Sequence, residues 1–388
     1  MGMAKVRIAL IGCGGAASVG HLPWIRENPQ ADFLATCDCS IEKARTAAKR
    51  WDASRSYSDG REMFEKERLD AVVVTTPPSS HLEIVSAAAE KGIHVLLEKP
   101  MAPTAKECDG IMAAAERHNI TLMMGHEKRF SPGFQKIKEL IDQGVLGTVF
   151  YLVIHWSTAV RLDPERLCPP KHQRSYEWRW KDPSVGGGIV QDHLPHYLDL
   201  WRWWTGSELE TVYAQLMNVR RDIIGDKETG GLYEDFGTVL MKFKDGCTAY
   251  FETGTVGRGI SPILHLGSGR GEWSEYGLIY GTRGHLIFDV FPWDSVELPR
   301  IMVFSLEDKR PADRGWYQVE FPDPWRSPEA GFEPFSNTAN LFRRQMDHFI
   351  SCVAERREPR ITGHDGKITL QAIEAVYKSQ ETGQAIRV

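Results

Sequence analysis

The sequence predicts a doubly wound α/β domain with a parallel sheet, followed by an α+β domain built on a large, open, mainly antiparallel sheet. Short apolar runs alternate with amphipathic segments up to residue 126, and longer strand patterns with glycine turns follow. The length of 388 residues suits two or three domains of roughly 150 residues each. We therefore expect domains at 1–126 and 127–388, with a helix at about 366–383 that could pack back on the first domain.

The first domain contains apolar runs typical of strands that are buried on both faces of a parallel sheet. The predicted strands are 5–12, 31–38, 69–78, 94–100 and 121–126. Amphipathic segments predict the helices that connect them, at 40–52, 79–92 and 104–119, and Ser40 is the expected N-cap of the first. Alternation of this kind implies right-handed crossovers between parallel strands.

The turn after the first strand has the pattern of a dinucleotide-binding loop, G-x-G-x-x-A. The loop consists of Gly12, Cys13, Gly14, Gly15, Ala16 and Ala17. Gly12 permits a tight turn, Gly14 lets the backbone approach a pyrophosphate, and Ala17 lets the helix pack closely on the strand. The N–H groups at the helix start can bind the phosphates. We expect a Rossmann-type nucleotide site here rather than a structural turn.

Asp38 closes the second predicted strand, where a carboxylate can accept hydrogen bonds from the adenosine ribose hydroxyls. The same carboxylate would repel a 2′-phosphate, and Cys39, Ser40 and Ile41 bring no arginine to bind one. Asp38 and Ser40 are therefore candidate cofactor-binding residues, and NAD is favoured over NADP. Arg45, on the following helix, could still reach a 2′-phosphate.

The second domain begins with a predicted strand at 147–158 and a helix at 186–206 that follows a glycine run. Strand patterns at 211–221, 234–256 and 275–289 predict an antiparallel sheet. Lys244-Asp245-Gly246 and the segment 281–284 are the expected turns within it. Amphipathic patterns predict helices at 337–356 and 366–383, and a basic, proline-containing stretch at 161–183 predicts a long loop.

The composition argues against several other classes of protein. The net charge of -5 and the pI near 6.2 give no reason to expect nucleic acid or an anionic membrane as partner. The sequence contains no run of 18 apolar residues, so no membrane span is predicted. The N-terminus lacks the pattern of a signal peptide. Seven scattered cysteines, without zinc-ligand spacing, favour a reduced, cytoplasmic protein.

An ordered set of motifs resembles the glucose–fructose oxidoreductase, inositol dehydrogenase and rhizopine-catabolism (Gfo/Idh/MocA) family. The motifs are GCGGAA at 12–17, TTPPSSH at 75–81, EKP at 98–100, GGGIVQDHLPH at 186–196, EDFGTVLMKFKDG at 234–246, YGTRG at 280–284 and ITGHDG at 361–366. The resemblance implies a Rossmann domain and an open-faced sheet domain that often forms dimers or tetramers. It also implies oxidation or reduction of a secondary alcohol on a sugar, cyclitol or related polyol.

The resemblance also suggests roles for individual residues. Lys99 resembles the catalytic lysine, and Asp192 and His196 resemble the residues that hold the reacting hydroxyl. Positions that resemble the cofactor lining are Thr76, Pro77, His81, Glu98, Trp178 and Arg179. His126 and His193 join Lys99, Arg179, Asp192 and His196 as candidate substrate residues. The chain is longer than short family members, and the extra residues fall at 157–183, 218–232 and 257–276. Enlarged loops suit a larger substrate such as a glycoside.

Hydride transfer from an alcohol needs a base for the hydroxyl proton close to the nicotinamide. Lys99 follows the fourth predicted strand, at the sheet edge where ligands bind. Burial beside an oxidised nicotinamide favours the neutral amine that can accept a proton. Asp192 and His196 lie four residues apart and share a helix face, so either His196 or Lys99 could take the proton. A metal at Asp192, His193 and His196 is not expected, because residues 192 and 193 point about 100° apart.

Three features leave alternatives open. The tryptophans of LWRWWTG at 200–206 predict core packing or, alternatively, a sugar-stacking surface. The basic loop is either a solvated face or a site for an anionic substrate, and it contains Arg161, Arg166, Lys171, His172, Arg174, Arg179 and Lys181. Glu234, Asp235 and Arg258 could line the substrate pocket. The leading function is an NAD-dependent polyol oxidoreductase. The alternatives are oxidation–elimination cleavage of a glycoside with cofactor recycling, and a non-catalytic NAD(H)-binding protein.

Overall fold

The computed structural model describes residues 5–158, 187–225, 233–255, 273–289, 300–306, 315–320 and 336–388. The chain divides into two compact units. Unit 1 comprises residues 1–130 and 338–371, and unit 2 comprises residues 131–337 and 372–388. Within the described residues, no helix is both long enough and apolar enough to span a membrane.

Among its described residues, unit 1 contains a six-stranded sheet in the order β3-β2-β1-β4-β5-β6, and neighbouring strands are parallel. The strands are β1 (Val6–Ile11), β2 (Ala31–Cys37), β3 (Arg55–Tyr57), β4 (Ala71–Val74), β5 (His94–Glu98) and β6 (Leu122–Gly125). The predicted parallel sheet is therefore confirmed. The sequence did not reveal β3, because this edge strand is only three residues long and has no buried apolar run.

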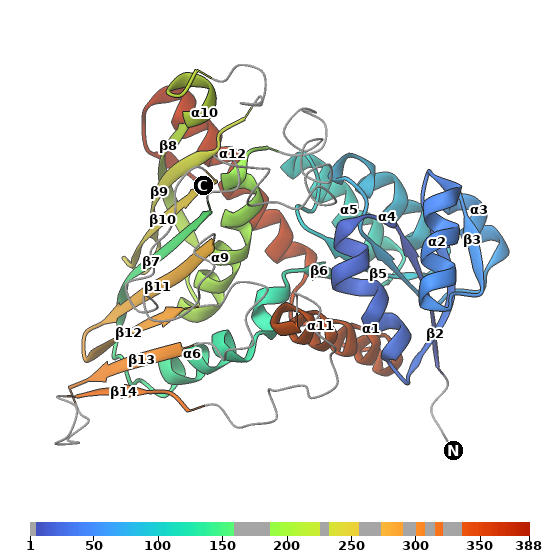
Figure 1. Cartoon of the computed structure of the whole chain (residues 1–388), viewed down its shortest axis with the longest axis horizontal. Helices are drawn as coiled ribbons and strands as arrows, with labels where there is room; N and C mark the ends of the chain where they lie inside the picture. Colours follow the sequence, from blue (N-terminus) through green and yellow to red (C-terminus); the bar gives the residue numbers. More distant parts are fainter. Residues whose placement is uncertain are drawn as a thin grey trace. The chain divides into compact units, whose positions relative to one another are not determined.

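Helices connect these strands in the alternation that the sequence predicted (Figure 1). They are α1 (Leu22–Glu27), α2 (Ile41–Trp51), α3 (Gly60–Lys66), α4 (His81–Glu90) and α5 (Ala105–Arg117). Three shorter turns complete the connections: a π-helical η1 (Ala17–His21) and the 3-10 turns η2 (Pro78–Ser80) and η3 (Glu127–Phe130). Ser40 is the N-cap of α2 as predicted, because its hydroxyl accepts a hydrogen bond from the Lys43 N–H.

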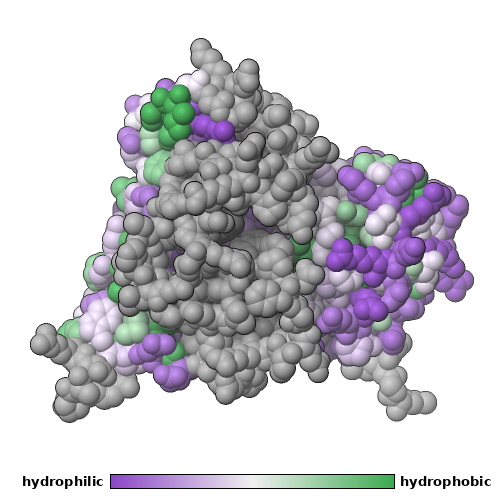
Figure 2. Space-filling model, in the orientation of Figure 1, coloured by the Kyte–Doolittle hydropathy of each residue, from purple (hydrophilic) through white to green (hydrophobic). Residues whose placement is uncertain are grey.

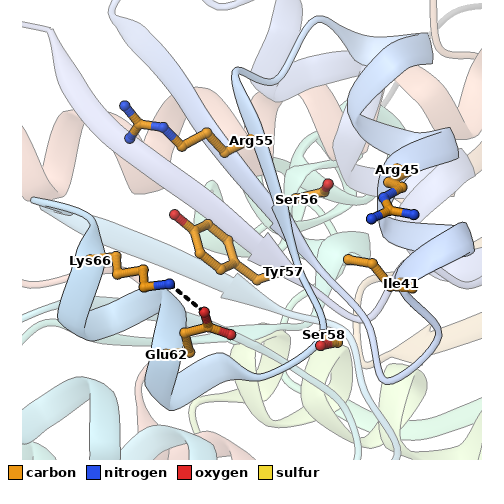
Figure 3. A pocket seen from close by; sticks show the side chains of 8 residues that line it. All are labelled: Ile41, Arg45, Arg55, Ser56, Tyr57, Ser58, Glu62 and Lys66. Atoms are coloured by element: carbon orange, nitrogen blue, oxygen red, sulfur yellow. Dashed lines mark hydrogen bonds and ion pairs between the residues drawn. The ribbon is translucent and has the colours of Figure 1, made fainter.

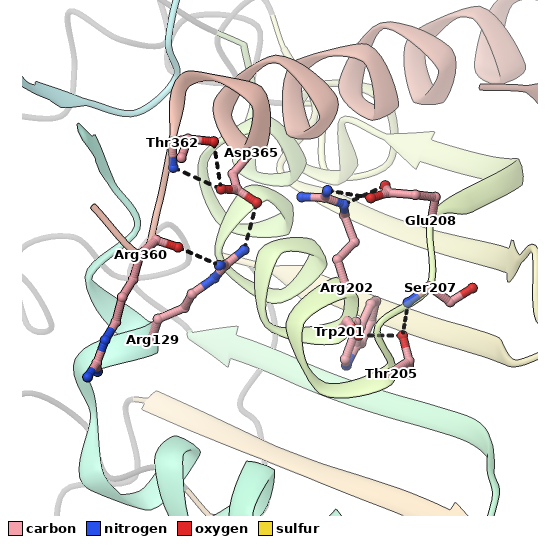
Figure 4. A network of polar contacts seen from close by, with 9 residues as sticks. All are labelled: Arg129, Trp201, Arg202, Thr205, Ser207, Glu208, Arg360, Thr362 and Asp365. Carbon is pink, nitrogen blue, oxygen red and sulfur yellow. Dashed lines mark hydrogen bonds and ion pairs between the residues drawn. The ribbon is translucent and has the colours of Figure 1, made fainter. Parts of the chain in front are cut away.

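A C-terminal segment completes unit 1. It consists of α11 (Ser336–Glu355) from residue 338 on and the first turns of α12 (Gly363–Thr382). Asp365 Oδ2 accepts the Thr362 N–H at 2.9 Å, and Asp365 Oδ1 accepts Arg129 Nη2 at 2.9 Å (Figure 4). These bonds join the start of α12 to the turn that follows β6. The predicted second domain at 127–388 includes this segment, with a helix at about 366–383 that could pack back on the first domain. Helix periodicity does not identify the surface on which a distant helix packs.

Among its described residues, unit 2 contains a nine-stranded sheet in the order β14-β13-β12-β11-β7-β10-β9-β8-β15. The strands are β7 (Val149–Thr158), β8 (Leu209–Met217), β9 (Phe236–Phe243), β10 (Thr248–Gly254), β11 (Trp273–Gly281), β12 (Gly284–Asp289), β13 (Arg300–Ser305), β14 (Trp316–Gln318) and β15 (Ile386–Arg387). Neighbouring described strands are antiparallel except β7 and β10, which are parallel. The mainly antiparallel sheet and both predicted turns are confirmed, whereas β13, β14 and β15 were missed.

One face of this sheet packs against helices (Figure 1). They are α9 (Ile189–Thr205), α6 (Pro132–Asp142) and the second half of α12, whose apolar residues share one buried core with the strands. Trp201 and Trp204 are buried in this core, and Trp204 Nε1 donates to the carbonyl oxygen of Phe134 at 3.2 Å. Core packing therefore accounts for these two tryptophans, and sugar stacking does not. Two hydrogen bonds of 2.7 Å from Arg202 to Glu208 join the end of α9 to the start of β8 (Figure 4).

The residues between β8 and β9 expose apolar surface. The short helix α10 (Val219–Asp222) is followed by Ile223 and Ile224, which are 70% and 54% exposed. Figure 2 shows hydrophobic surface gathered in the region of α10. Residues 218–225 are the described part of the segment 218–232, in which the family resemblance predicted extra residues.

Candidate functional site

The glycine loop of unit 1 approaches the end of β4 closely. Gly12 has a φ of +96°, and a Cβ added there would lie 2.8 Å from backbone atoms of Thr75 and Thr76. Only glycine fits this position without moving the backbone. An added Cβ at Gly14 or Gly15 would meet no atom of the described residues within 4 Å, and both glycines are exposed. The loop therefore has a tight base at Gly12 and an accessible backbone at the position predicted for a pyrophosphate.

Asp38 links this loop to the start of α2. Its Oδ2 accepts the Cys13 N–H at 2.8 Å, and its Oδ1 accepts the Ser40 N–H at 2.9 Å. The two bonds hold the carboxylate at the end of β2, beside the glycine loop. Burial, and then the nearby Asp38 charge, raise the pKa of the Cys13 thiol to about 12. Cys13 therefore remains a neutral thiol at neutral pH and offers no nucleophile.

His81 connects two loops at the same edge of the sheet. The ring is fully buried, with Nε2 2.9 Å from the Thr76 carbonyl oxygen and Nδ1 3.0 Å from the Met101 carbonyl oxygen. Burial lowers the pKa of this imidazole. The buried ring bridges two backbone carbonyls, so it joins Thr76, one of the predicted cofactor-lining positions, to the segment after Lys99.

Lys99 and His126 follow the neighbouring strands β5 and β6, which pair in parallel up to Glu98 and Gly125. Lys99 is half-buried and His126 is 1% exposed. The Lys99–Pro100 peptide bond is cis. The carboxyl ends of parallel strands form the ligand-binding edge of such sheets. Lys99 and His126 therefore lie at the same edge of unit 1 as Gly12 and Asp38, which follow β1 and β2.

The triple glycine of unit 2 has a structural cause. A Cβ added at Gly188 would lie 2.1 Å from the Glu234 side chain, and Gly188 N–H donates to the Tyr377 hydroxyl at 3.2 Å. Glu234 Oε1 accepts the Val190 N–H at 3.1 Å and the Tyr377 hydroxyl at 3.0 Å. Burial and the Glu234 charge raise the pKa of Tyr377 well above its usual value. Glu234 thus binds the N-terminus of α9, and its role as pocket lining stays a prediction.

Asp235 is also structural. It is fully buried, and it accepts the Val219 N–H at 2.7 Å and the Arg220 N–H at 3.1 Å. These bonds satisfy the first amides of α10. The interpretation of Asp235 as a pocket residue is therefore not supported by its contacts.

The candidate substrate residues of unit 2 lie on the first two turns of α9. Asp192 and His196 are partly buried, and both belong to one helix face. The His193 ring packs on Trp156 with a centroid distance of 3.6 Å, and its Nδ1 lies 3.1 Å from Thr253 Oγ1. His193 is therefore held against the sheet. The sequence did not indicate Trp156 or Thr253, although strand alternation places both on the helix-covered face.

Some predicted site residues cannot be placed. Trp178, Arg179, the basic loop and Arg258 lie outside the described residues. Within the described ranges, no group of three or more histidine, cysteine, aspartate or glutamate side chains could hold a metal ion.

Arg45 lines an open cleft on the outer side of unit 1, between α2, β3 and α3 (Figure 3). The other lining residues are Ile41, Arg55, Ser56, Tyr57, Ser58, Glu62 and Lys66. Lys66 pairs with Glu62 at 2.5 Å, and Arg55 forms an ion pair with Glu67. These ion pairs partly neutralise the basic side chains of the cleft. Arg45 lines the cleft together with Ile41, which follows Ser40 in the chain.

Two family models match most of the chain. The model described as "Oxidoreductase family, NAD-binding Rossmann fold" matches residues 6–126. The model described as "GFO/IDH/MocA C-terminal domain" matches residues 134–287. The fold and the edge of the parallel sheet thus define an NAD-binding oxidoreductase. This chain belongs to the Gfo/Idh/MocA family.

Several known proteins resemble the chain over nearly its whole length. D-apiose dehydrogenase of Paraburkholderia graminis is 26% identical, over 98% of this chain and 89% of that protein. The 2,7-anhydro-N-acetylneuraminate hydratase of Mediterraneibacter gnavus is 28% identical, over 100% of this chain and 97% of that protein. The structure of scyllo-inositol dehydrogenase from Lactobacillus casei, with bound NAD(H) and scyllo-inositol, has a TM-score of 0.74 at 19% identity and covers 99% of both chains. This last likeness shows the shared fold.

The residues of unit 1 fit a bound NAD. The accessible backbone at Gly14 and Gly15 and the start of the following helical turn offer N–H groups to the pyrophosphate. Asp38 lies beside that loop with a carboxylate that can also accept ribose hydroxyls. Thr76 and Lys99 follow strands of the same edge. The glycine loop, Asp38, Thr76 and Lys99 thus all lie at one edge of the parallel sheet.

Alanine at Gly12 and at Gly14 separates the two roles of the loop. We expect Gly12→Ala to destabilise the apoprotein by about 1–3 kcal/mol, because its φ is positive and its Cβ contacts backbone. Gly14→Ala meets no neighbouring atom, so the apoprotein should keep its Tm while NADH binding weakens roughly tenfold or more. Thermal melting and a fluorescence titration measure the two effects. Normal NADH affinity in Gly14→Ala would rule out the pyrophosphate assignment.

Proposed function

We propose that this protein is an NAD-dependent oxidoreductase that transfers a hydride between nicotinamide and a secondary hydroxyl or ketone of a sugar, cyclitol, sugar acid or glycoside. The main observation is the position of Lys99 at the carboxyl edge of the parallel sheet, the edge at which the glycine loop and Asp38 also lie. Full-length similarity to D-apiose dehydrogenase supports a carbohydrate-like substrate. The nicotinamide supplies the hydride chemistry when it is bound.

In this proposal, the protein binds and deprotonates the reacting hydroxyl. Lys99, Asp192 and His196 are the residues proposed to act on that hydroxyl and its neighbours. Either the Lys99 amine or the His196 imidazole accepts the hydroxyl proton, and Asp192 accepts a hydrogen bond from an adjacent hydroxyl. His193, held by Trp156 and Thr253, forms a fixed wall of the substrate site. His126 is proposed as a further substrate residue, and the pair Trp178-Arg179 is proposed for the nicotinamide end.

A second candidate is cleavage of a glycoside by transient oxidation and elimination, with the cofactor regenerated. Its support is the full-length relative named as a hydratase, since hydration of a substrate involves no net oxidation or reduction. The predicted enlarged loops suit a glycoside or a similarly large substrate. An anionic substrate would suit the basic loop 161–181.

We also propose that NAD is used in preference to NADP. The Asp38 carboxylate is held beside the loop by two backbone N–H groups, and its charge disfavours a 2′-phosphate. The basic residue Arg45 lines the neighbouring cleft.

Oligomer formation through the open face of the sheet is a further part of the proposal. Leu240 is 49% exposed and Tyr213 is 37% exposed on this sheet, and His155 stacks on Tyr276 with ring centroids 4.9 Å apart. An apolar and aromatic sheet face of this kind suits a second copy of the chain, giving a homodimer or homotetramer. Its mass, measured by sedimentation, would then be a multiple of 43.9 kDa. We propose a cytoplasmic location, because the cysteines of the described residues are free thiols.

A substrate panel tests the function. NADH formation is followed with inositols, D-apiose and other sugars, sugar acids and glycosides, and released aglycone is measured in parallel. Steady NADH formation would identify a dehydrogenase, and aglycone release without net NADH would identify the cleavage reaction. We expect Lys99→Ala to lower kcat by roughly 100-fold or more, because it removes a group that holds or takes the proton. Lys91→Ala, at an exposed lysine after α4, is the matched control and should keep activity.

Unchanged turnover in Lys99→Ala would show that this lysine is not catalytic. Binding of NADH without turnover of any substrate in the panel would favour the non-catalytic alternative.

A titration tests the cofactor preference. NADH should bind at least roughly tenfold more tightly than NADPH, a difference of about 1.4 kcal/mol, because Asp38 repels the 2′-phosphate. Asp38→Asn keeps the shape of the side chain and removes its charge, so it should reduce the difference between the NADH and NADPH affinities. Tighter binding of NADPH to the unmodified protein would contradict the assignment.

A further inference from the structure

A buried histidine outside the predicted site contacts the carboxylate next to Lys99. His21 is the last residue of the π-helical turn η1, and it is 0% exposed. Its Nε2 lies 2.7 Å from Glu98 Oε1. Interruptions of the π type in a helix are frequent at functional sites, because they turn a side chain away from its regular direction.

Glu98 contacts both His21 and Lys99. Its second oxygen, Oε2, accepts the Lys99 backbone N–H at 3.1 Å. The carboxylate is also confined against the neighbouring strand, since a Cβ added at Gly125 would lie 3.0 Å from Oε1. One carboxylate oxygen of Glu98 thus contacts the His21 ring, and the other accepts the backbone N–H of Lys99. Both oxygens of Glu98 are therefore engaged by groups of the protein.

The His21 ring has little freedom. It packs edge-on against Phe342 with a centroid distance of 5.6 Å. The Phe342 ring is itself confined, since a Cβ added at Gly20 would lie 2.8 Å from it. Its Nδ1 has no hydrogen-bond partner among the described residues. A proton on that buried nitrogen would be left without an acceptor, so the N–H is favoured at Nε2, where it donates to Glu98.

We propose that His21 is a positioning residue for Lys99, acting through Glu98. The chain of contacts runs from the buried ring to the carboxylate and then to the Lys99 amide. It fixes the backbone from which the lysine side chain extends. The inference rests on the proposed function, since positioning matters to catalysis only if Lys99 contacts the reacting hydroxyl. A misplacement of about 1 Å can cost roughly 100-fold in rate.

The test compares two replacements of His21 in the full-length protein. His21→Gln keeps an N–H donor near the position of Nε2, whereas His21→Leu fills similar space without a donor. His94→Leu is the matched control, because His94 lies at the opposite end of β5 and its Nδ1 accepts the Thr121 N–H at 2.8 Å. If His21→Leu does not fold, His21→Asn replaces it, since the shorter amide does not reach Glu98.

The first measurement is amide hydrogen exchange of the peptide that spans residues 97–103, in the presence of NADH, and it needs no substrate. We expect exchange to be roughly tenfold faster in His21→Leu, and close to the original rate in His21→Gln and His94→Leu. The second measurement is steady-state kinetics with a substrate from the panel. We expect His21→Leu to lower kcat roughly ten- to 100-fold, with KM for NAD within about twofold, and His21→Gln to restore most of kcat.

Unchanged exchange in His21→Leu, or equal losses in the leucine and glutamine variants, would overturn the positioning role. Failure of the proposed function gives a different result: exchange still responds to His21→Leu, while Lys99→Ala keeps its turnover.

Discussion

The rest of unit 1 depends on the close approach of two backbones at Gly12. Strand β1 lies between β2 and β4, and its loop must pass the end of β4 with no room for a Cβ. This approach leaves the backbone of the next glycines accessible and brings the loop within hydrogen-bonding distance of Asp38. Because parallel strands end at one edge, the same arrangement brings Lys99 to that edge. This steric constraint thus acts at the sheet edge that carries both the proposed cofactor site and Lys99.

A second constraint governs unit 2. The N-terminus of α9 approaches the buried Glu234 so closely that a side chain at Gly188 would overlap it. Glu234 and Tyr377 satisfy the first amides of the helix, and the helix then presents Asp192 and His196 along one face. The packing of His193 on Trp156 fixes the rotation of α9 against the sheet. Each unit therefore holds its candidate residues by backbone contacts that allow little adjustment.

Sequence patterns predicted those parts of the structure that depend on local periodicity and steric rules. The parallel strands, the glycine loop, the Ser40 cap and the turns at 244–246 and 281–284 belong to this group. Short edge strands such as β3 and β15 were missed because a few residues give no periodic signal. The contacts of Glu234 and Asp235 with helix N-termini were not predicted, since a motif does not reveal whether a carboxylate faces a pocket or a helix terminus. His21 contacts Glu98 and Phe342, which lie 77 and 321 positions further along the chain. The only local signal for these contacts was a histidine at the end of a turn.

The central claim is that Lys99 and His196 act on the same hydroxyl, and a double-mutant cycle on kcat/KM tests it most directly. Residues that act as a unit show strongly non-additive losses. We expect the Lys99→Ala/His196→Ala double variant to be hardly slower than the slower single variant, within about threefold. If the two losses multiply in the double variant, the residues act independently and the shared site is contradicted.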